Sequence, residues 1–222
     1  MDLSPLLISL RTAAAAILVT FFAGLAAAAL VVRLRQRGWK LILDGVLTLP
    51  LVLPPTVAGF FLLYIFGVRG PLGKFLLDFF GLRIAFSWSA TVLAAVVISF
   101  PLMYRSARGA LEQVDPTLIY AARTLGMPEG AIFWRVSLPS AMPGIASGAV
   151  LAFARGLGEF GATAMIAGNI AGKTRTLPLA IYSAVAAGDM DEAYGYVLVI
   201  MLVSFIVVAL MNYCAALEKR PR

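Results

Sequence analysis

The chain has 222 residues, of which 61% are hydrophobic and 13% are charged, and its mean hydropathy is +0.94. This composition lies far outside the range of soluble domains and indicates an integral membrane protein. The net charge of +7 comes from cations at the borders of apolar runs, without the aromatic platforms or motifs of nucleic-acid-binding folds, so no nucleic-acid partner is predicted. With no histidine and one cysteine, the sequence excludes an intramolecular disulfide and a His/Cys metal cluster.

Apolar runs long enough to cross a bilayer occur five times. A spanning helix needs roughly 20 apolar residues, and a helix satisfies its own backbone polar groups in the hydrocarbon core. The predicted fold is therefore an all-α polytopic membrane protein with spans at residues 12–32, 45–66, 84–104, about 143–167 and 193–217. A further apolar stretch, residues 177–188, is too short to cross and is predicted to be a re-entrant or interfacial helix.

The distribution of Lys and Arg predicts the orientation of these spans. With the N-terminus outside and the C-terminus in the cytoplasm, eleven cations lie inside and six lie outside, as the positive-inside rule requires. The inner cations are Arg33, Arg35, Arg37, Lys40, Arg105, Arg108, Arg123, Arg135, Lys219, Arg220 and Arg222.

Prolines interrupt the second predicted span. Pro54 and Pro55 lack backbone N–H groups, and irregular backbone at membrane depth is tolerated where protein or a water-filled cavity supplies partners. The freed N–H groups, Thr56 and the helix N-terminus after the break are therefore candidates to line a path for an anion. A plain kink that serves packing is the alternative.

Residues 116–139 form a polar segment among these apolar runs, and helical signals occur in it twice. Asp115 before Pro116 predicts a helix start, and Gly126 predicts its end. Pro128 and Glu129 predict a second short helix, which Leu138 and Pro139 close and which has Ile132, Phe133 and Trp134 available for burial. The segment is predicted to be a docking surface.

The fourth predicted span contains two charges, Arg155 and Glu159, whose spacing places them on one helix face. Charged groups inside a membrane are costly and usually functional. Three roles stay open: an internal ion pair that fastens helices, a gate element that changes partner between states, and direct contact of Arg155 with a transported anion.

The spacing within residues 116–139 resembles the EAA loop of ABC importer permeases, whose pattern is EAA, three residues, G, nine residues, and I-x-L-P. Ala121, Ala122, Gly126, Leu138 and Pro139 match it. Tyr120 replaces the usual glutamate and Val136 the usual isoleucine. The resemblance implies contact with an ATPase through Ile119, Tyr120, Ala121, Ala122, Arg123, Leu125, Gly126, Phe133, Leu138 and Pro139.

A wider resemblance covers nearly the whole chain. The segments LPLVLPPTVAGF, SFPLMYRSARGALEQVD, AARTLG and LAFARGLGEFGAT are similar to molybdate permeases of the ModB type. Sulfate permeases share much of this pattern but usually carry an additional N-terminal span. The resemblance implies one transmembrane domain over residues 1–222, with a cytoplasmic coupling loop at about 105–139, in the type I fold of ABC importer permeases.

The same resemblance implies the partners and the function. Two copies form a homodimer in a bacterial inner membrane, a pair of cytoplasmic ATPases binds ATP and Mg²⁺, and a periplasmic protein delivers the oxyanion. The implied substrate is molybdate, with tungstate as a co-substrate, and Pro54, Pro55, Thr56, Arg155 and Glu159 are candidates for the path or gate. This chain itself is expected to bind no cofactor and to catalyse no bond chemistry.

Two alternatives differ in substrate or in transport class. A permease for sulfate, thiosulfate or another oxyanion would share most of these motifs. A stand-alone secondary transporter would need membrane-embedded acids or histidines for ion coupling, and often inverted repeats. The sequence offers one embedded acid, Glu159, and no histidine, which favours the ATP-driven class.

Overall fold

The computed structural model describes residues 2–34 and 36–218 of the chain as a helical protein, with no strand in those residues. Arg35, Lys219, Arg220 and Arg222, which contribute to the predicted orientation, lie outside the described residues. The helices are α1 (Ser4–Arg33), α2 (Arg37–Val52), α3 (Pro55–Phe66), α4 (Pro71–Phe80), α5 (Trp88–Glu112), α6 (Pro116–Thr124), α7 (Glu129–Ile132), a π-helical turn η1 (Phe133–Ser137), α8 (Leu138–Leu157), α9 (Gly161–Ala167), α10 (Leu177–Ala187) and α11 (Met190–Glu218).

Four helices among the described residues are long and apolar enough to cross a membrane, and a fifth crossing follows if the bent pair α2–α3 counts as one. The predicted second span is therefore not straight: α2 and α3 meet at 109° across Leu53 and Pro54. The predicted fourth span also breaks, because α8 ends at Leu157 and the short α9 begins at Gly161.

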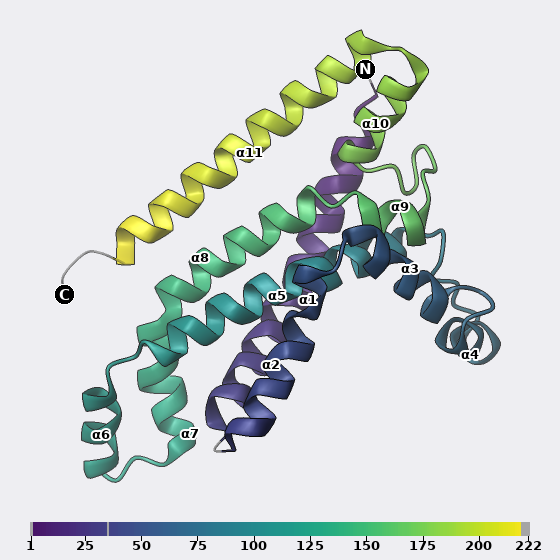
Figure 1. Cartoon of the computed structure of the whole chain (residues 1–222). Coiled ribbons are helices and arrows are strands. Elements are labelled where there is room, and N and C mark those ends of the chain that lie inside the picture. The colour runs from purple at the N-terminus through teal and green to yellow at the C-terminus, as the bar shows by residue number, and fades with distance from the viewer. Residues whose placement is uncertain (1, 35, 219–222) are drawn as a thin grey trace.

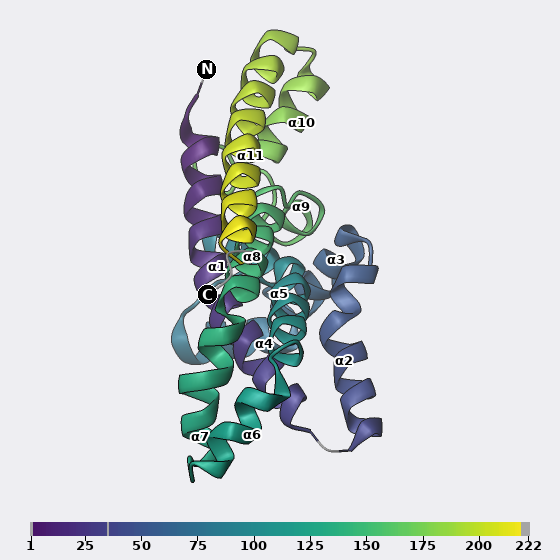
Figure 2. The ribbon, with the colours of Figure 1, turned by 90° about the vertical axis from the view of Figure 1, so that its left-hand side faces the viewer.

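The bundle is built on α5, which packs against α1 on one side and α8 on another (Figure 1). Figures 1 and 2 place α6 and α7 at one end of the molecule, and the N-terminus and α10 at the other. The last helix, α11, contacts α8 and α10 and keeps a broad apolar face exposed. Such a face suits lipid or a second subunit.

Hydroxyl pairs join α1 to α5 inside the bundle. Thr12 Oγ1 lies 2.9 Å from Thr91 Oγ1, and Thr20 Oγ1 lies 3.3 Å from Ser99 Oγ, at the same sequence separation of 79 residues. Moving eight residues along α1, from Thr12 to Thr20, is matched by moving eight residues in the same chain direction along α5, from Thr91 to Ser99. The two helices are therefore parallel. The bent pair between them therefore makes one return crossing, in agreement with five predicted spans. Small residues allow this close approach of membrane helices.

An ionic cluster joins α2 to α5 near the end that carries α6. Lys40 Nζ lies 2.8 Å from Glu112 Oε1, and Arg108 Nε lies 3.1 Å from the same oxygen. Arg108 also binds Asp44, whose carboxylate accepts a 2.9 Å hydrogen bond from the Tyr104 hydroxyl. The cluster holds the first half of the broken span against the bundle.

Gly24 provides a test of the α1–α5 contact. A Cβ at this position would lie 2.8 Å from Met103 Cγ, so Gly24→Leu should lower the free energy of unfolding by about 1–3 kcal/mol, the cost of overpacking. Thermal unfolding of the purified protein in detergent measures the loss. Gly45→Leu is the control, because nothing lies within 4 Å of a Cβ there; equal losses in the two variants would contradict the contact.

Candidate functional site

The predicted docking segment folds as two helices joined by a glycine turn. The Asp115 carboxylate accepts a 2.8 Å hydrogen bond from the Thr117 N–H at the start of α6, and this bond lowers the pKa of Asp115. Gly126 has φ +75° and ends the helix, while the Met127 N–H bonds the Ala122 carbonyl at 3.1 Å. Both predicted caps of α6 are present.

The second predicted helix starts at Glu129 but does not end at Leu138 and Pro139. It continues without a break from Glu129 to Leu157, through α7, η1 and α8. Proline inside a helix removes one hydrogen bond and crowds the carbonyl four residues earlier. The π-helical turn directly before Leu138 widens the helix at this point, which lets the chain pass Pro139 and remain helical.

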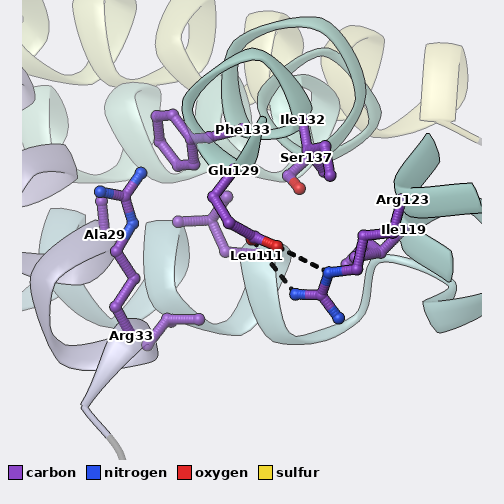
Figure 3. Close-up of a pocket in the computed structure, with 10 residues that line it drawn as sticks. Ala29, Arg33, Leu111, Ile119, Arg123, Glu129, Ile132, Phe133 and Ser137 are labelled. Carbon is purple, nitrogen blue, oxygen red and sulfur yellow. Dashed lines mark hydrogen bonds and ion pairs between the residues drawn. The ribbon is translucent and has the colours of Figure 1, made fainter. Parts of the chain in front are cut away.

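A polar brace ties α6 to α7, and α1 lies close by (Figure 3). Arg123 binds Glu129 through two nitrogens, with N···O distances of 2.7 and 3.1 Å, and this carboxylate raises the pKa of Arg123. The guanidinium of Arg33 on α1 lies 4.9 Å from the centre of the Phe133 ring. These residues line a cavity of about 400 Å³ together with Leu111, Ile119, Ile132 and Ser137.

The predicted contact residues divide into an exposed and a covered group. Ala122 and Leu138 are 5% and 7% exposed, and Ile119 and Phe133 pack against the core that α1, α5 and α8 form. These covered side chains hold the segment on the bundle. The remaining predicted contacts, Tyr120, Ala121, Arg123, Leu125, Gly126 and Pro139, are exposed.

Two further apolar side chains of the segment face outward, Leu118 and Trp134. Trp134 is 66% exposed, although it was predicted to be available for burial together with Ile132 and Phe133. Ile132 is buried and Phe133 half-buried, so the next residue along the helix turns away from the bundle. The segment therefore has an apolar outer surface made by Leu118, Trp134 and Leu125, of which Leu125 is 81% exposed. Helical periodicity in the sequence could have indicated this surface.

The two regions predicted to line the path, residues 54–56 and residues 155–159, lie close to each other in the structure. A Cβ on Gly161, the first residue of α9, would lie 3.1 Å from Pro55 Cβ and 3.2 Å from the Thr56 nitrogen. A Cβ on Gly59 would lie 2.7 Å from Ala162 Cα. The start of α3 therefore touches the start of α9, and the prolines and the embedded charges, more than 90 residues apart, belong to one region.

The embedded charges bridge the break between α8 and α9. Arg155 Nη1 lies 2.7 Å from Glu159 Oε2, and Glu159 Oε1 accepts a 2.8 Å hydrogen bond from the Ala162 N–H. Glu159 is 2% exposed, whereas the Arg155 side chain is 31% exposed. One carboxylate thus serves both the end of α8 and the start of α9.

Residues 12–222 match the model of the binding-protein-dependent transport system inner membrane component family. The chain belongs to this family. It is a multi-pass inner-membrane component of a transporter, and the fold is that of the permease of a type I ABC importer.

Individual relatives differ in the substrate that their names give. The chain is 52% identical to the molybdenum transport system permease protein ModB of Escherichia coli K12 over 80% of this chain and 77% of that protein. It is 32% identical to the probable sulfate transport system permease protein cysT of Chlorokybus atmophyticus over 98% of this chain and 75% of that protein.

Solved structures share the fold at low sequence identity. A chain of the bacterial alginate ABC transporter, in complex with a pentasaccharide-bound periplasmic protein, superimposes with a TM-score of 0.75 at 15% identity, covering 99% of this chain and 80% of that one. At this identity the likeness shows the fold alone.

Glu159 provides a test of the helix break. Glu159→Ala should lower the free energy of unfolding by about 1–3 kcal/mol, because it leaves the Ala162 N–H without its acceptor. Glu159→Gln keeps an amide oxygen at this position and should lose less. Thermal unfolding in detergent compares the two variants; equal losses would show that the hydrogen bond to α9 contributes nothing.

Proposed function

We propose that this chain is the membrane-spanning subunit of an ATP-driven importer that carries molybdate, with tungstate as a co-substrate, into the cytoplasm. The observation that carries the proposal is the 52% identity to a protein named as a molybdenum permease, within a family whose members serve binding-protein-dependent transport. Sulfate is the second candidate substrate, which the 32% identical relative supports. The larger identity favours molybdate.

The proposed assembly contains two copies of the chain, two cytoplasmic ATPases and a periplasmic oxyanion-binding protein. Five crossings in one subunit are few for an enclosed path, so the path lies between two copies. We propose that the α6–α7 end lies in the cytoplasm and the N-terminus outside, and the excess of Lys and Arg at the α6–α7 end supports this orientation. The eleven-residue α10 is then a re-entrant or interfacial helix on the outer side.

The docking segment, residues 116–139, is the proposed attachment point for the ATPase. Its outer surface carries Leu118, Tyr120, Leu125 and Trp134, a set suited to a helix seated in an apolar groove. ATP binding closes the ATPase dimer, the two segments move with it, and the paired spans change from inward-open to outward-open. This chain supplies the path and the attachment, and the ATPase supplies ATP hydrolysis.

Uptake of radiolabelled molybdate tests the substrate and the energy source together. The purified complex of chain, ATPase and binding protein in proteoliposomes should accumulate molybdate only with ATP inside. Excess unlabelled sulfate should compete weakly if molybdate is the substrate. Uptake by the chain alone without ATP would contradict the proposal and support a secondary transporter.

Leu125→Asp tests the attachment point. Leu125 is 81% exposed, so the change leaves the subunit folded, and it should weaken ATPase association about tenfold or more, the effect of losing one apolar anchor. Copurification of the ATPase with the tagged chain measures the loss. Leu82→Asp is the control, since Leu82 is 58% exposed and lies between α4 and α5, on the proposed outer side. Normal copurification with Leu125→Asp would refute the assignment.

A further inference from the structure

A second groove lies between α5 and α8, apart from the cavity of the docking segment. Its volume is about 390 Å³, and it opens to the surface of the subunit. It is lined from α5 by Arg105, Ser106, Gly109 and Ala110, just beyond the end of α5 by Gln113, and from α8 by Gly144, Ser147, Gly148 and Leu151.

Arg105 is the cation of this groove, and it differs from its neighbour Arg108 in its direct ion pairs. Arg108, three residues later, binds both Asp44 and Glu112. Arg105 also borders the cavity that contains Asp44, but that carboxylate is already bound to Arg108 and Tyr104. Arg105 is exposed and forms no ion pair with any side chain that the structure describes.

Hydroxyl groups and glycines complete the groove. The Ser147 hydroxyl oxygen is buried and has no hydrogen-bond partner in the described part of the chain. A Cβ at Gly148 would overlap the Ser106 side chain, so this glycine lets α8 approach α5 beside the groove, whereas a Cβ at Gly109 would meet nothing within 4 Å. A guanidinium, two hydroxyls and the Gln113 amide supply the donors that a tetrahedral oxyanion needs.

The groove continues the face of α8 that carries Arg155. Positions 144, 148, 151 and 155 recur at helical spacing and therefore lie on one side of the helix. The helical rise separates Arg155 from Leu151 by about 6 Å and from Gly144 by about 16 Å. An anion that passes the break between α8 and α9 would meet the groove next on its way to the docking segment.

We propose that this groove is a transient oxyanion-binding site on the exit side of the path, with Arg105 as its cationic ligand and Ser106 and Ser147 as hydroxyl donors. The inference rests on the proposed function, whose substrate is a tetrahedral oxyanion. An open groove with one arginine binds weakly, as release into the cytoplasm requires. The phosphate of an anionic lipid headgroup has the same chemistry, and the experiment separates the two sources.

Protection of a cysteine in the groove measures occupancy directly. The reporter is Gly109→Cys, placed in the full chain together with Cys214→Ser, and the alkylation rate is measured in detergent with added molybdate, and in parallel with added sulfate. Molybdate at its dissociation constant fills half of the sites and should slow alkylation about twofold. Adding Arg105→Gln should abolish the protection, whereas adding Arg37→Gln, another exposed arginine of the proposed cytoplasmic side, should leave it unchanged.

The same reporter distinguishes a lipid headgroup from the transported ion. In phosphatidylcholine vesicles molybdate should still protect, and phosphatidylglycerol without molybdate should not. Protection by phosphatidylglycerol alone would assign the groove to lipid and overturn the proposal. Equal alkylation rates with and without molybdate and sulfate would also overturn it.

Transport by the whole complex connects occupancy with function. Arg105→Gln should lower molybdate uptake about tenfold while ATPase copurification stays normal, Arg105→Lys should retain part of the uptake, and Arg37→Gln should match the unmodified chain. Normal uptake by Arg105→Gln would show that the groove is not an oxyanion-binding site of the path, and it would leave the proposed function intact. If the unmodified complex carries sulfate and no molybdate, the proposed substrate is wrong. The groove is then tested with sulfate, which should slow alkylation of the cysteine at position 109 if the groove binds the transported oxyanion.

Discussion

The contact between two broken helices is the constraint on which the rest of this structure depends. Backbone polar groups in the hydrocarbon core of a bilayer need partners within the protein, so an interrupted helix is tolerated only where another part of the chain covers it. Here the breaks before α3 and before α9 cover each other. Gly59 and Gly161 bring the two helix starts into contact, and Glu159 binds the Ala162 N–H that the second break exposes. After the 109° bend, α3 packs on α9 and leads to α4, which lies to one side of the bundle (Figure 1).

The second of these breaks lies at the end of a helix that begins in the docking segment. From Glu129 to Leu157 the chain is one helix, and 29 residues extend about 43 Å. A displacement of α7 therefore reaches Arg155 without passing through a loop. The π-helical turn beside Pro139 lies where this helix leaves the docking segment and enters the bundle. The arrangement suits a subunit in which a movement at one end must open or close a path at the other.

Sequence patterns predicted which residues enter the membrane but not how the helices bend. The first, third and last spans were confirmed, as were the capped start of α6 and the positive φ of Gly126, because apolar length and caps are local properties. The 109° bend and the separate α9 depend on which helices meet, and composition alone does not contain that information. Pro54 and Pro55 indicated a break, but the sequence did not show that Gly59 and Gly161 bring this break into contact with the start of α9.

The docking segment shows the same limit at the level of single side chains. The spacing of the motif predicted a set of contact residues. Burial divides this set, because Ala122 and Leu138 hold the segment in place whereas Leu125 is exposed and can reach a partner. Leu138 and Pro139 were expected to end a helix, and a widened turn lets the helix continue instead. Whether a proline stops a helix depends on the backbone before it, which no short motif records.

The charges of the docking segment are largely satisfied within the chain. Arg123 binds Glu129, and the position that usually carries a glutamate in the EAA pattern holds Tyr120, whose ring lies 5.9 Å from the Arg123 guanidinium. Because the arginine is already paired, a partner approaching this surface meets few free charges and several exposed apolar groups. We therefore expect attachment of the ATPase to depend weakly on salt, since screening acts on exposed charges and leaves apolar burial in place. An association that weakened steeply as salt was raised would instead place the main contact on Arg123 and Arg135, the two cations of the segment.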